Sequence, residues 1–109
     1  MKDTFKHKGL RQQLVTVLIA KGIKDEAVLK AIGNIPRHLF MDSSFLDHAY
    51  QDKAFPIAAD QTISQPYTVA FQTELLQVKK GDKILEIGTG SGYQSAVLCE
   101  LDAKVYSIE

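Results

Sequence analysis

The sequence has few of the features that mark secreted, membrane-bound or nucleic-acid-binding proteins. It contains one cysteine, Cys99, which cannot form a disulfide within the chain, so a reducing, cytoplasmic setting is expected. No segment approaches the ~20 apolar residues of a membrane span, and the polar start lacks the pattern of a signal peptide. Thirteen basic residues balance thirteen acidic ones, which argues against nucleic acid or a membrane as partner and leaves the oligomeric state open.

The histidines and the cysteine give no pattern that points to chemistry. His7, His38 and His48 lack a serine or cysteine partner at an interpretable spacing, so surface or packing roles are expected for them. They also form no metal-ligand motif with Cys99, and no metal is expected. The apolar residues around Cys99 predict that it is a small core residue.

Hydrophobic spacing and helix-stop residues predict several helices and two strands. The helices are expected over residues 5–21, 26–32, 66–78 and 91–101, and the strands over residues 83–87 and 104–108. Asp25 is placed as the N-cap of the second helix, and Pro66 suits the first turn of the third. Residues 37–65 lack periodicity and are predicted to be irregular and partly extended.

The order strand, helix, strand near the end of the chain predicts an α/β fold with a doubly wound, mostly parallel sheet. The first strand, residues 83–87, is short and apolar, which fits a strand buried on both faces. Near Gly81 the sequence changes from helical and irregular patterns to the strand–helix–strand pattern, and this change divides the chain into two regions. Residues 1–80 form a helical and irregular region, and residues 81–109 begin a Rossmann-like domain.

A glycine loop between the first strand and the helix is the most informative motif. Gly88, Gly90 and Gly92 form the pattern G-x-G-x-G, and such glycines let a ligand approach main-chain N–H groups at a helix start. Tyr93 stands where a dinucleotide fingerprint needs its third glycine, and the G-K-[ST] of a P-loop is absent. With Glu86 ahead of it, the loop resembles motif I of class I S-adenosylmethionine-dependent methyltransferases.

This resemblance implies S-adenosyl-L-methionine as cofactor and a Rossmann-like methyltransferase fold. The cofactor has no phosphates, and an acid such as Glu86 suits its ammonium and sulfonium charges. Glu109 falls at the end of the next strand, where an acid accepts hydrogen bonds from ribose hydroxyls. The cofactor-binding residues expected in this part of the chain are Glu86, Gly88, Gly90, Ser91, Gly92 and Glu109.

A region upstream of the glycine loop indicates which class of substrate the chain would methylate. It resembles the signature of protein-L-isoaspartate O-methyltransferases in residues 36–40, 49–57 and 61–70, and the resemblance runs nearly the whole chain. It implies that four consecutive residues contact the cofactor: Gln61, Thr62, Ile63 and Ser64. It also implies that Ser64 is the active-site residue. Val69 stands where some relatives carry a cofactor-contacting histidine, so that role is not transferred to it.

The implied reaction methylates the free α-carboxylate of L-isoaspartyl residues in damaged proteins, which is a protein-repair activity. That carboxylate has a pKa of roughly 3.5 and is already ionised at neutral pH, so no general base is needed. Our hypothesis is that the Ser64 hydroxyl orients it. From chemistry alone, Ser64 could equally be the N-cap of the helix that follows.

Other functions stay open on the sequence alone. One is a class I methyltransferase with another substrate, such as a small molecule or RNA, and another is a non-catalytic cofactor-binding or partner-binding module. A nicotinamide-binding Rossmann protein is a more distant alternative because of Tyr93. The expected sheet has only its first two strands before Glu109, so we expect an amino-terminal fragment that is inactive and marginally folded by itself.

Overall fold

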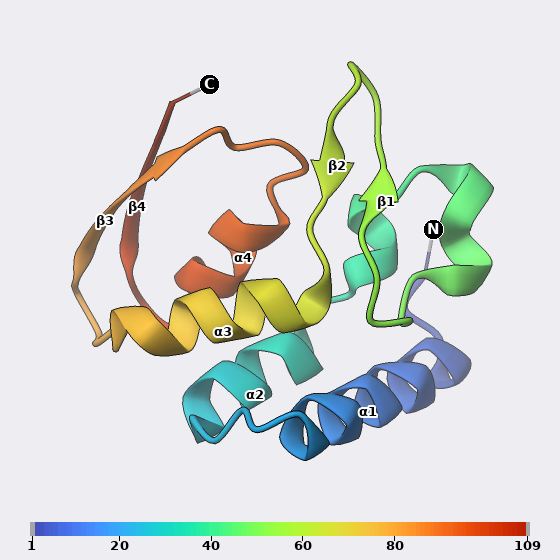
Figure 1. Ribbon diagram of the computed structural model, residues 1–109, viewed down its shortest axis with the longest axis horizontal. Coiled ribbons are helices and arrows are strands. Elements are labelled where there is room, and N and C mark those ends of the chain that lie inside the picture. Colours follow the sequence, from blue (N-terminus) through green and yellow to red (C-terminus); the bar gives the residue numbers. More distant parts are fainter. Residues whose placement is uncertain (1, 109) are drawn as a thin grey trace.

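The computed structural model describes residues 2–108, which form a helical layer, a small hairpin and a β-α-β unit (Figure 1). The elements are α1 (Phe5–Ala20), α2 (Glu26–Asn34), η1 (Arg37–Phe40), η2 (Ser43–His48), β1 (Phe55–Pro56), β2 (Thr62–Ile63), α3 (Pro66–Leu76), β3 (Lys83–Ile87), α4 (Tyr93–Glu100) and β4 (Lys104–Ile108). Within these residues, every helix is too short or too polar to cross a bilayer.

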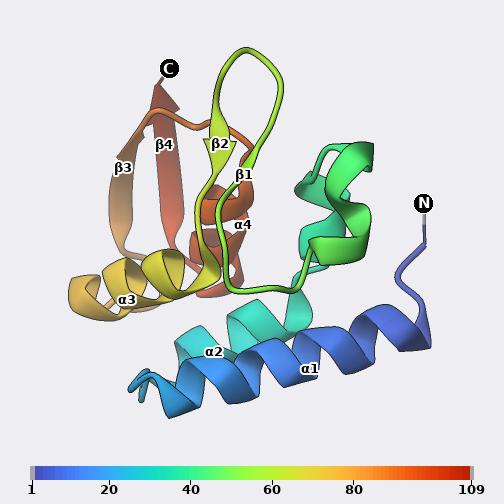
Figure 2. The same cartoon turned by 45° about the vertical axis from the view of Figure 1, so that its right-hand side comes forward.

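The β-α-β unit confirms the predicted Rossmann-like beginning of the fold. Strands β3 and β4 are parallel, with Leu85 opposite Tyr106 and Ile87 opposite Ile108, and α4 connects them. The prediction that the first strand is buried on both faces is wrong for this chain. Leu85 and Ile87 are 62% and 75% exposed, because α4 covers only one face of the sheet (Figure 2).

Capping explains where two of the helices begin. The Asp25 side chain accepts hydrogen bonds from main-chain N–H groups in the first turn of α2, which confirms it as N-cap. The alternative of Ser64 as the cap of α3 is wrong, because Gln65 occupies that position and makes no side-chain cap bond. Instead, the Asp52 carboxylate accepts from the Tyr67 N–H at 2.8 Å, which satisfies an N–H at the start of α3.

The segment predicted as irregular contains the two 3-10 helices and an antiparallel hairpin of β1 and β2, joined by a tight turn. Ala59 and Asp60 at its tip have φ values of 60° and 56°, in the left-handed region that favours glycine or asparagine. The Ile57 N–H donates to the Gln61 carbonyl at 2.8 Å and closes the turn. This turn sets the course of β2 and of the residues that follow it.

One hydrophobic core joins the helical region to the β-α-β unit. Leu18 of α1, Ile32 of α2, Ala70 of α3 and Val97 of α4 are all 0% exposed and belong to the same cluster. Burial of an aliphatic side chain of the size of leucine stabilises the folded state by about 1.5–3 kcal/mol. The prediction that Cys99 is a core residue is wrong, because Cys99 lies on the exposed side of α4 as a free thiol.

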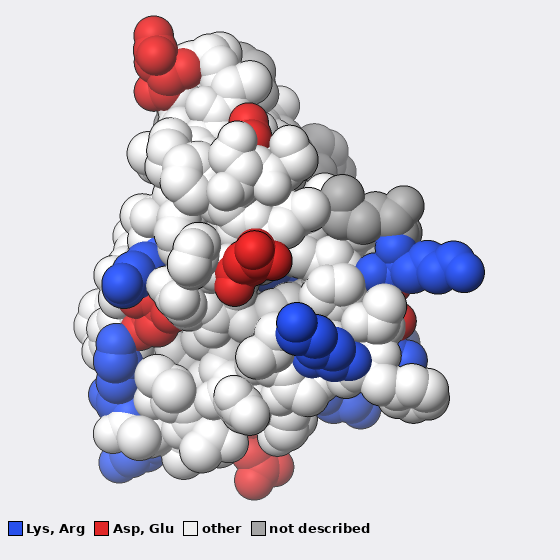
Figure 3. All heavy atoms as spheres, turned by 90° about the vertical axis from the view of Figure 1, so that its right-hand side faces the viewer, with Lys and Arg blue, Asp and Glu red and all other residues white. Residues whose placement is uncertain are grey.

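Charged side chains of both signs are present on the face drawn in Figure 3, where they stand among many uncharged residues. Two ion pairs join described residues, Arg11 with Asp3 and Lys21 with Asp52.

Candidate functional site

A small cavity lies where β2, the loop after β3 and the start of α4 meet, and its volume is about 80 Å³. Six of the predicted site residues line it: Thr62, Ser64, Glu86, Gly88, Gly90 and Ser91. Figures 1 and 2 both show the loop after β3 reaching across to β2. Sites for small molecules usually enclose about 300–1,000 Å³, so this cavity can hold only part of a cofactor.

The glycine loop reaches β2 because its backbone takes conformations that other residues rarely adopt. Gly90 has a φ of 55°, and a Cβ added to it would lie 3.9 Å from the Thr62 carbonyl oxygen. Gly92 has a φ of 85° and is the N-cap that directly precedes α4. The loop therefore brings the start of a helix, with its main-chain N–H groups, next to the 62–64 segment.

Glu86 is oriented by two serines from neighbouring elements. Its Oε1 accepts hydrogen bonds from the hydroxyls of Ser95 in α4 and Ser107 in β4, the second at 3.1 Å. Its other carboxylate oxygen has no hydrogen-bond partner among residues 2–108. An oriented acid with one unpaired oxygen, half-buried beside a glycine loop, suits a cationic group of a ligand.

Ser64 lines the cavity with a hydroxyl that no described residue binds. Its side chain is exposed, and the hydroxyl makes no hydrogen bond within the described part of the chain. Its main-chain carbonyl is fixed by a hydrogen bond, because Nη2 of Arg37 donates to it at 2.9 Å. The side chain is thus available to a ligand while the backbone beneath it is fixed.

Three other predicted site residues do not line the cavity. Ile63, which follows the exposed Thr62 in β2, is 1% exposed in the core, as expected for successive residues of a strand. Gln61 lies exposed at the end of the hairpin turn, and Gly92 is the N-cap of α4. Glu109 lies outside the described residues.

The cavity also includes residues for which sequence reasoning assigned no site role: Val69, Thr89, Tyr93 and Gln94. Tyr93 and Gln94 open the helix after the glycine loop, and that position was the signal that could have identified them. Burial raises the pKa of Tyr93 to about 12, so its phenol stays protonated. The Gln94 amide donates to the Thr73 hydroxyl at 2.9 Å, which ties α4 to α3.

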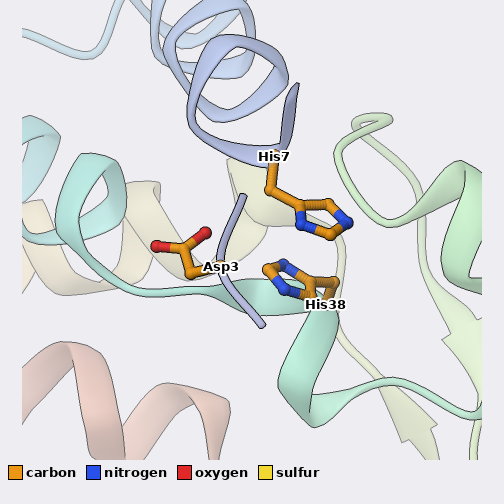
Figure 4. Close-up of side chains that lie close together, drawn as sticks. All are labelled: Asp3, His7 and His38. Atoms are coloured by element: carbon orange, nitrogen blue, oxygen red, sulfur yellow. The ribbon is translucent and has the colours of Figure 1, made fainter. Parts of the chain in front are cut away.

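Asp3, His7 and His38 form a second cluster, and none of the three lines the cavity (Figure 4). The two imidazole rings are stacked with centroids 3.7 Å apart and planes inclined by 17°, so their in-plane lone pairs do not converge. The Asp3 carboxylate is bound by Arg11 at 2.8 Å. Both ring nitrogens of His38 are in hydrogen bonds, one with the Tyr50 hydroxyl at 2.7 Å and one with a main-chain carbonyl at 3.0 Å. The cluster anchors the start of the chain.

Comparison with known proteins gives a consistent result along the chain. The family model described as protein-L-isoaspartate(D-aspartate) O-methyltransferase matches residues 9–109. A protein-L-isoaspartate O-methyltransferase of Christiangramia forsetii is 80% identical over 109 residues, which is 100% of this chain and 51% of the relative. One of Flavobacterium psychrophilum is 74% identical over 109 residues, with the same shares of the two chains. The chain therefore spans about half the length of the curated relatives it matches.

Solved structures agree with this fold. One protein-L-isoaspartate O-methyltransferase superposes with a TM-score of 0.79 at 33% identity, over 91% of this chain and 33% of its own. A Plasmodium falciparum protein in complex with S-adenosyl-L-homocysteine superposes with a TM-score of 0.75 at 24% identity, over 91% of this chain and 48% of its own. Both likenesses support the fold class predicted from the glycine loop.

Proposed function

Because the chain belongs to the protein-L-isoaspartate(D-aspartate) O-methyltransferase family, we propose that its cavity binds S-adenosyl-L-methionine and serves methyl transfer to isoaspartyl residues of damaged proteins. The observation that carries this proposal is the convergence on one cavity of Ser64, Glu86 and the glycine loop. These groups come from separate parts of the sequence and offer a hydroxyl donor, an anionic acceptor and accessible main-chain N–H groups.

The residues of the cavity fit one end of the cofactor. The unpaired oxygen of Glu86 can accept from the ammonium of its amino-acid part, and the start of α4 behind Gly92 offers N–H donors to its carboxylate. The volume of about 80 Å³ is too small for the adenosine part as well. When bound, the cofactor supplies an electrophilic sulfonium methyl group, which a carboxylate oxygen accepts without any proton transfer.

Ser64 is the residue to which we assign the orientation of the substrate. A carboxylate at neutral pH needs no base, so the protein contributes position and the removal of water, and effective molarity can supply about 7–11 kcal/mol. The Ser64 hydroxyl can donate one hydrogen bond to that carboxylate because no described residue already uses it. Thr62 lies on the same side of the strand and can border the same ligand.

The test is methyl transfer by a fused protein. The part of the Christiangramia forsetii relative that lies beyond its match is joined to the carboxyl end of this chain. The fused protein is incubated with labelled S-adenosyl-L-methionine and either an isoaspartyl peptide or the same peptide with a normal aspartyl residue. We expect label to enter only the isoaspartyl peptide, as a base-labile methyl ester.

Two results would contradict the proposal. Equal methylation of both peptides would indicate another class of methyl acceptor. A folded fused protein that binds S-adenosyl-L-homocysteine but labels neither peptide would favour a cofactor-binding module. The 109-residue chain itself serves as the control, and we expect it to transfer no methyl group at a measurable rate because its cavity holds only part of the cofactor.

The proposed partners follow from the same reaction. Isoaspartyl-containing proteins and peptides are the substrates, and the cytoplasm is the proposed compartment.

A further inference from the structure

The segment of residues 36–40, which the proposed chemistry does not use, places a fully buried guanidinium behind Ser64. Arg37 is 0% exposed, which is unusual for an arginine. Its Nε donates to the Ala49 carbonyl at 3.0 Å, and its Nη2 donates to the carbonyls of Lys53 at 3.2 Å and Ser64 at 2.9 Å. One side chain therefore binds three main-chain carbonyls from two segments of the chain.

The same guanidinium also contacts the other wall of the cavity. Its central carbon lies 4.8 Å from the centroid of the Tyr93 ring, in a cation–π arrangement. Tyr93 is 1% exposed and is the first residue of α4, directly after the glycine loop. Arg37 thus stands between the Ser64 segment and the helix that the glycine loop begins.

No main-chain ladder among the described residues joins these two walls. Strand β2 pairs with β1 alone, and β3 pairs with β4 in a separate sheet. The distance between Ser64 and the glycine loop consequently depends on side-chain packing and on contacts such as those of Arg37. A sheet hydrogen bond would have fixed that distance without a charged residue.

The free-energy cost of burying the Arg37 guanidinium indicates that its hydrogen-bond donors have a specific role. Among residues 2–108, no carboxylate forms an ion pair with Arg37, and its Nη1 has no hydrogen-bond partner. An apolar residue of similar size would fill the space at lower cost in desolvation. A guanidinium, however, presents several N–H donors in a rigid planar fork, so it can bind separate carbonyls at the same time.

We propose that Arg37 is a positioning residue, which holds the backbone of Ser64 against the Tyr93 end of the glycine loop and so fixes the Ser64 hydroxyl on the cavity. The importance of that position rests on the proposed function of the cavity. The position itself does not, and it can be measured without any ligand.

The experiment compares Arg37→Lys with Arg11→Lys in the fused protein described above. Arg11 is a matched control, because it is 4% exposed and donates to Asp3, Tyr50 and a main-chain carbonyl but to none of the cavity-lining residues. NMR gives the carbonyl carbon shift of Ser64 and the amide shifts of residues 61–65 and 88–94. Urea unfolding of each variant gives the loss of stability.

We expect Arg37→Lys to move the Ser64 carbonyl resonance and to shift or broaden the amides on both walls of the cavity, since one ammonium cannot replace the fork. Arg11→Lys should leave those resonances unchanged, even if it lowers the free energy of unfolding as much as Arg37→Lys does or more. The proposal is overturned if the site resonances of Arg37→Lys match the wild type, or if both variants perturb them in proportion to lost stability. Should Arg37→Lys be unfolded, Arg37→Met, which keeps the volume, is judged by the same resonances.

Titration with S-adenosyl-L-homocysteine then separates the two proposals. If the fused protein binds it, Arg37→Lys in the fused protein should weaken binding by about tenfold or more, because a displacement near 1 Å has large effects on the alignment of groups in a site. A fused protein whose cavity order depends on Arg37 but which does not respond to the probe supports the positioning role and counts against the proposed function. Unchanged affinity in a variant with moved resonances counts against the positioning role.

Discussion

Replacement of Ser64 by alanine should separate activity from stability. The hydroxyl has no hydrogen-bond partner within residues 2–108, and the side chain is exposed. Its removal leaves no buried group unsatisfied and creates no cavity in the core. We therefore expect the free energy of unfolding to change by less than about 0.5 kcal/mol.

The expected effect on methyl transfer is much larger. A hydrogen bond from a hydroxyl to a charged carboxylate contributes about 1.5–3 kcal/mol. A factor of ten in rate corresponds to about 1.4 kcal/mol, so loss of this bond should lower kcat/KM for an isoaspartyl peptide by about ten- to a hundredfold. The ionised carboxylate needs no base, so the pH profile of the variant should keep its shape.

The assay is methyl transfer by the fused protein, with Ser64→Ala measured beside Ser43→Ala. Ser43 is an exposed serine of η2 that does not line the cavity, so its replacement should alter neither property. A Ser64→Ala variant that keeps kcat/KM within about twofold of the parent would refute the orientation role. Loss of activity together with a matching loss of stability would show that Ser64 is needed for folding instead.

Three further predictions follow from other parts of the structure. Burial lowers the pKa of His38, so the unfolded chain binds a proton first, and stability should fall as pH drops below the ordinary value of about 6.5; a His38 ring that titrates by NMR at that value would contradict this. Combining Ala59→Asn with Asp60→Gly should raise the free energy of unfolding by about 1 kcal/mol by relieving the left-handed turn, and a lower urea midpoint would show that the turn is not strained. Leu85→Lys should leave the stability of the 109-residue chain nearly unchanged, because the Leu85 side chain is 62% exposed. The same change should destabilise the fused protein if further helices cover that face of the β3–β4 sheet there. Thermal unfolding of both proteins measures the two effects.

Local signals in the sequence were sufficient for most of the fold. The N-cap at Asp25, the proline at the start of α3 and the glycines after β3 each act within a few residues of the structure they form, and the starts of α2 and α3 and the end of β3 were predicted from them. The convergence of Ser64 with the glycine loop was suggested by the family resemblance. Periodicity alone would not have indicated it, because Ser64 and the glycine loop follow strands of two different sheets.

Errors arose where the environment of a residue depends on distant parts of the chain. Leu85 was expected to be buried because the strand is apolar, but exposure depends on whether a second layer covers that face. Cys99 was expected in the core because apolar residues precede it, but the next position on a helix turns by about 100° toward solvent. Ser64 was considered as a cap, yet Asp52 reaches the start of α3 from an earlier segment.

The contrast between the glycine loop and residues 36–40 shows how much of a site a motif can reveal. The loop is recognisable from sequence because its glycines meet backbone requirements that other residues cannot meet. Arg37 has no such local signature, since its donors serve carbonyls 12 to 27 residues further along the chain. The loop supplies one wall of the cavity and the Ser64 segment supplies the other, without a shared sheet to align them. The alignment of the two walls is therefore a tertiary property, and a residue outside the recognisable cofactor motif is the one placed to control it.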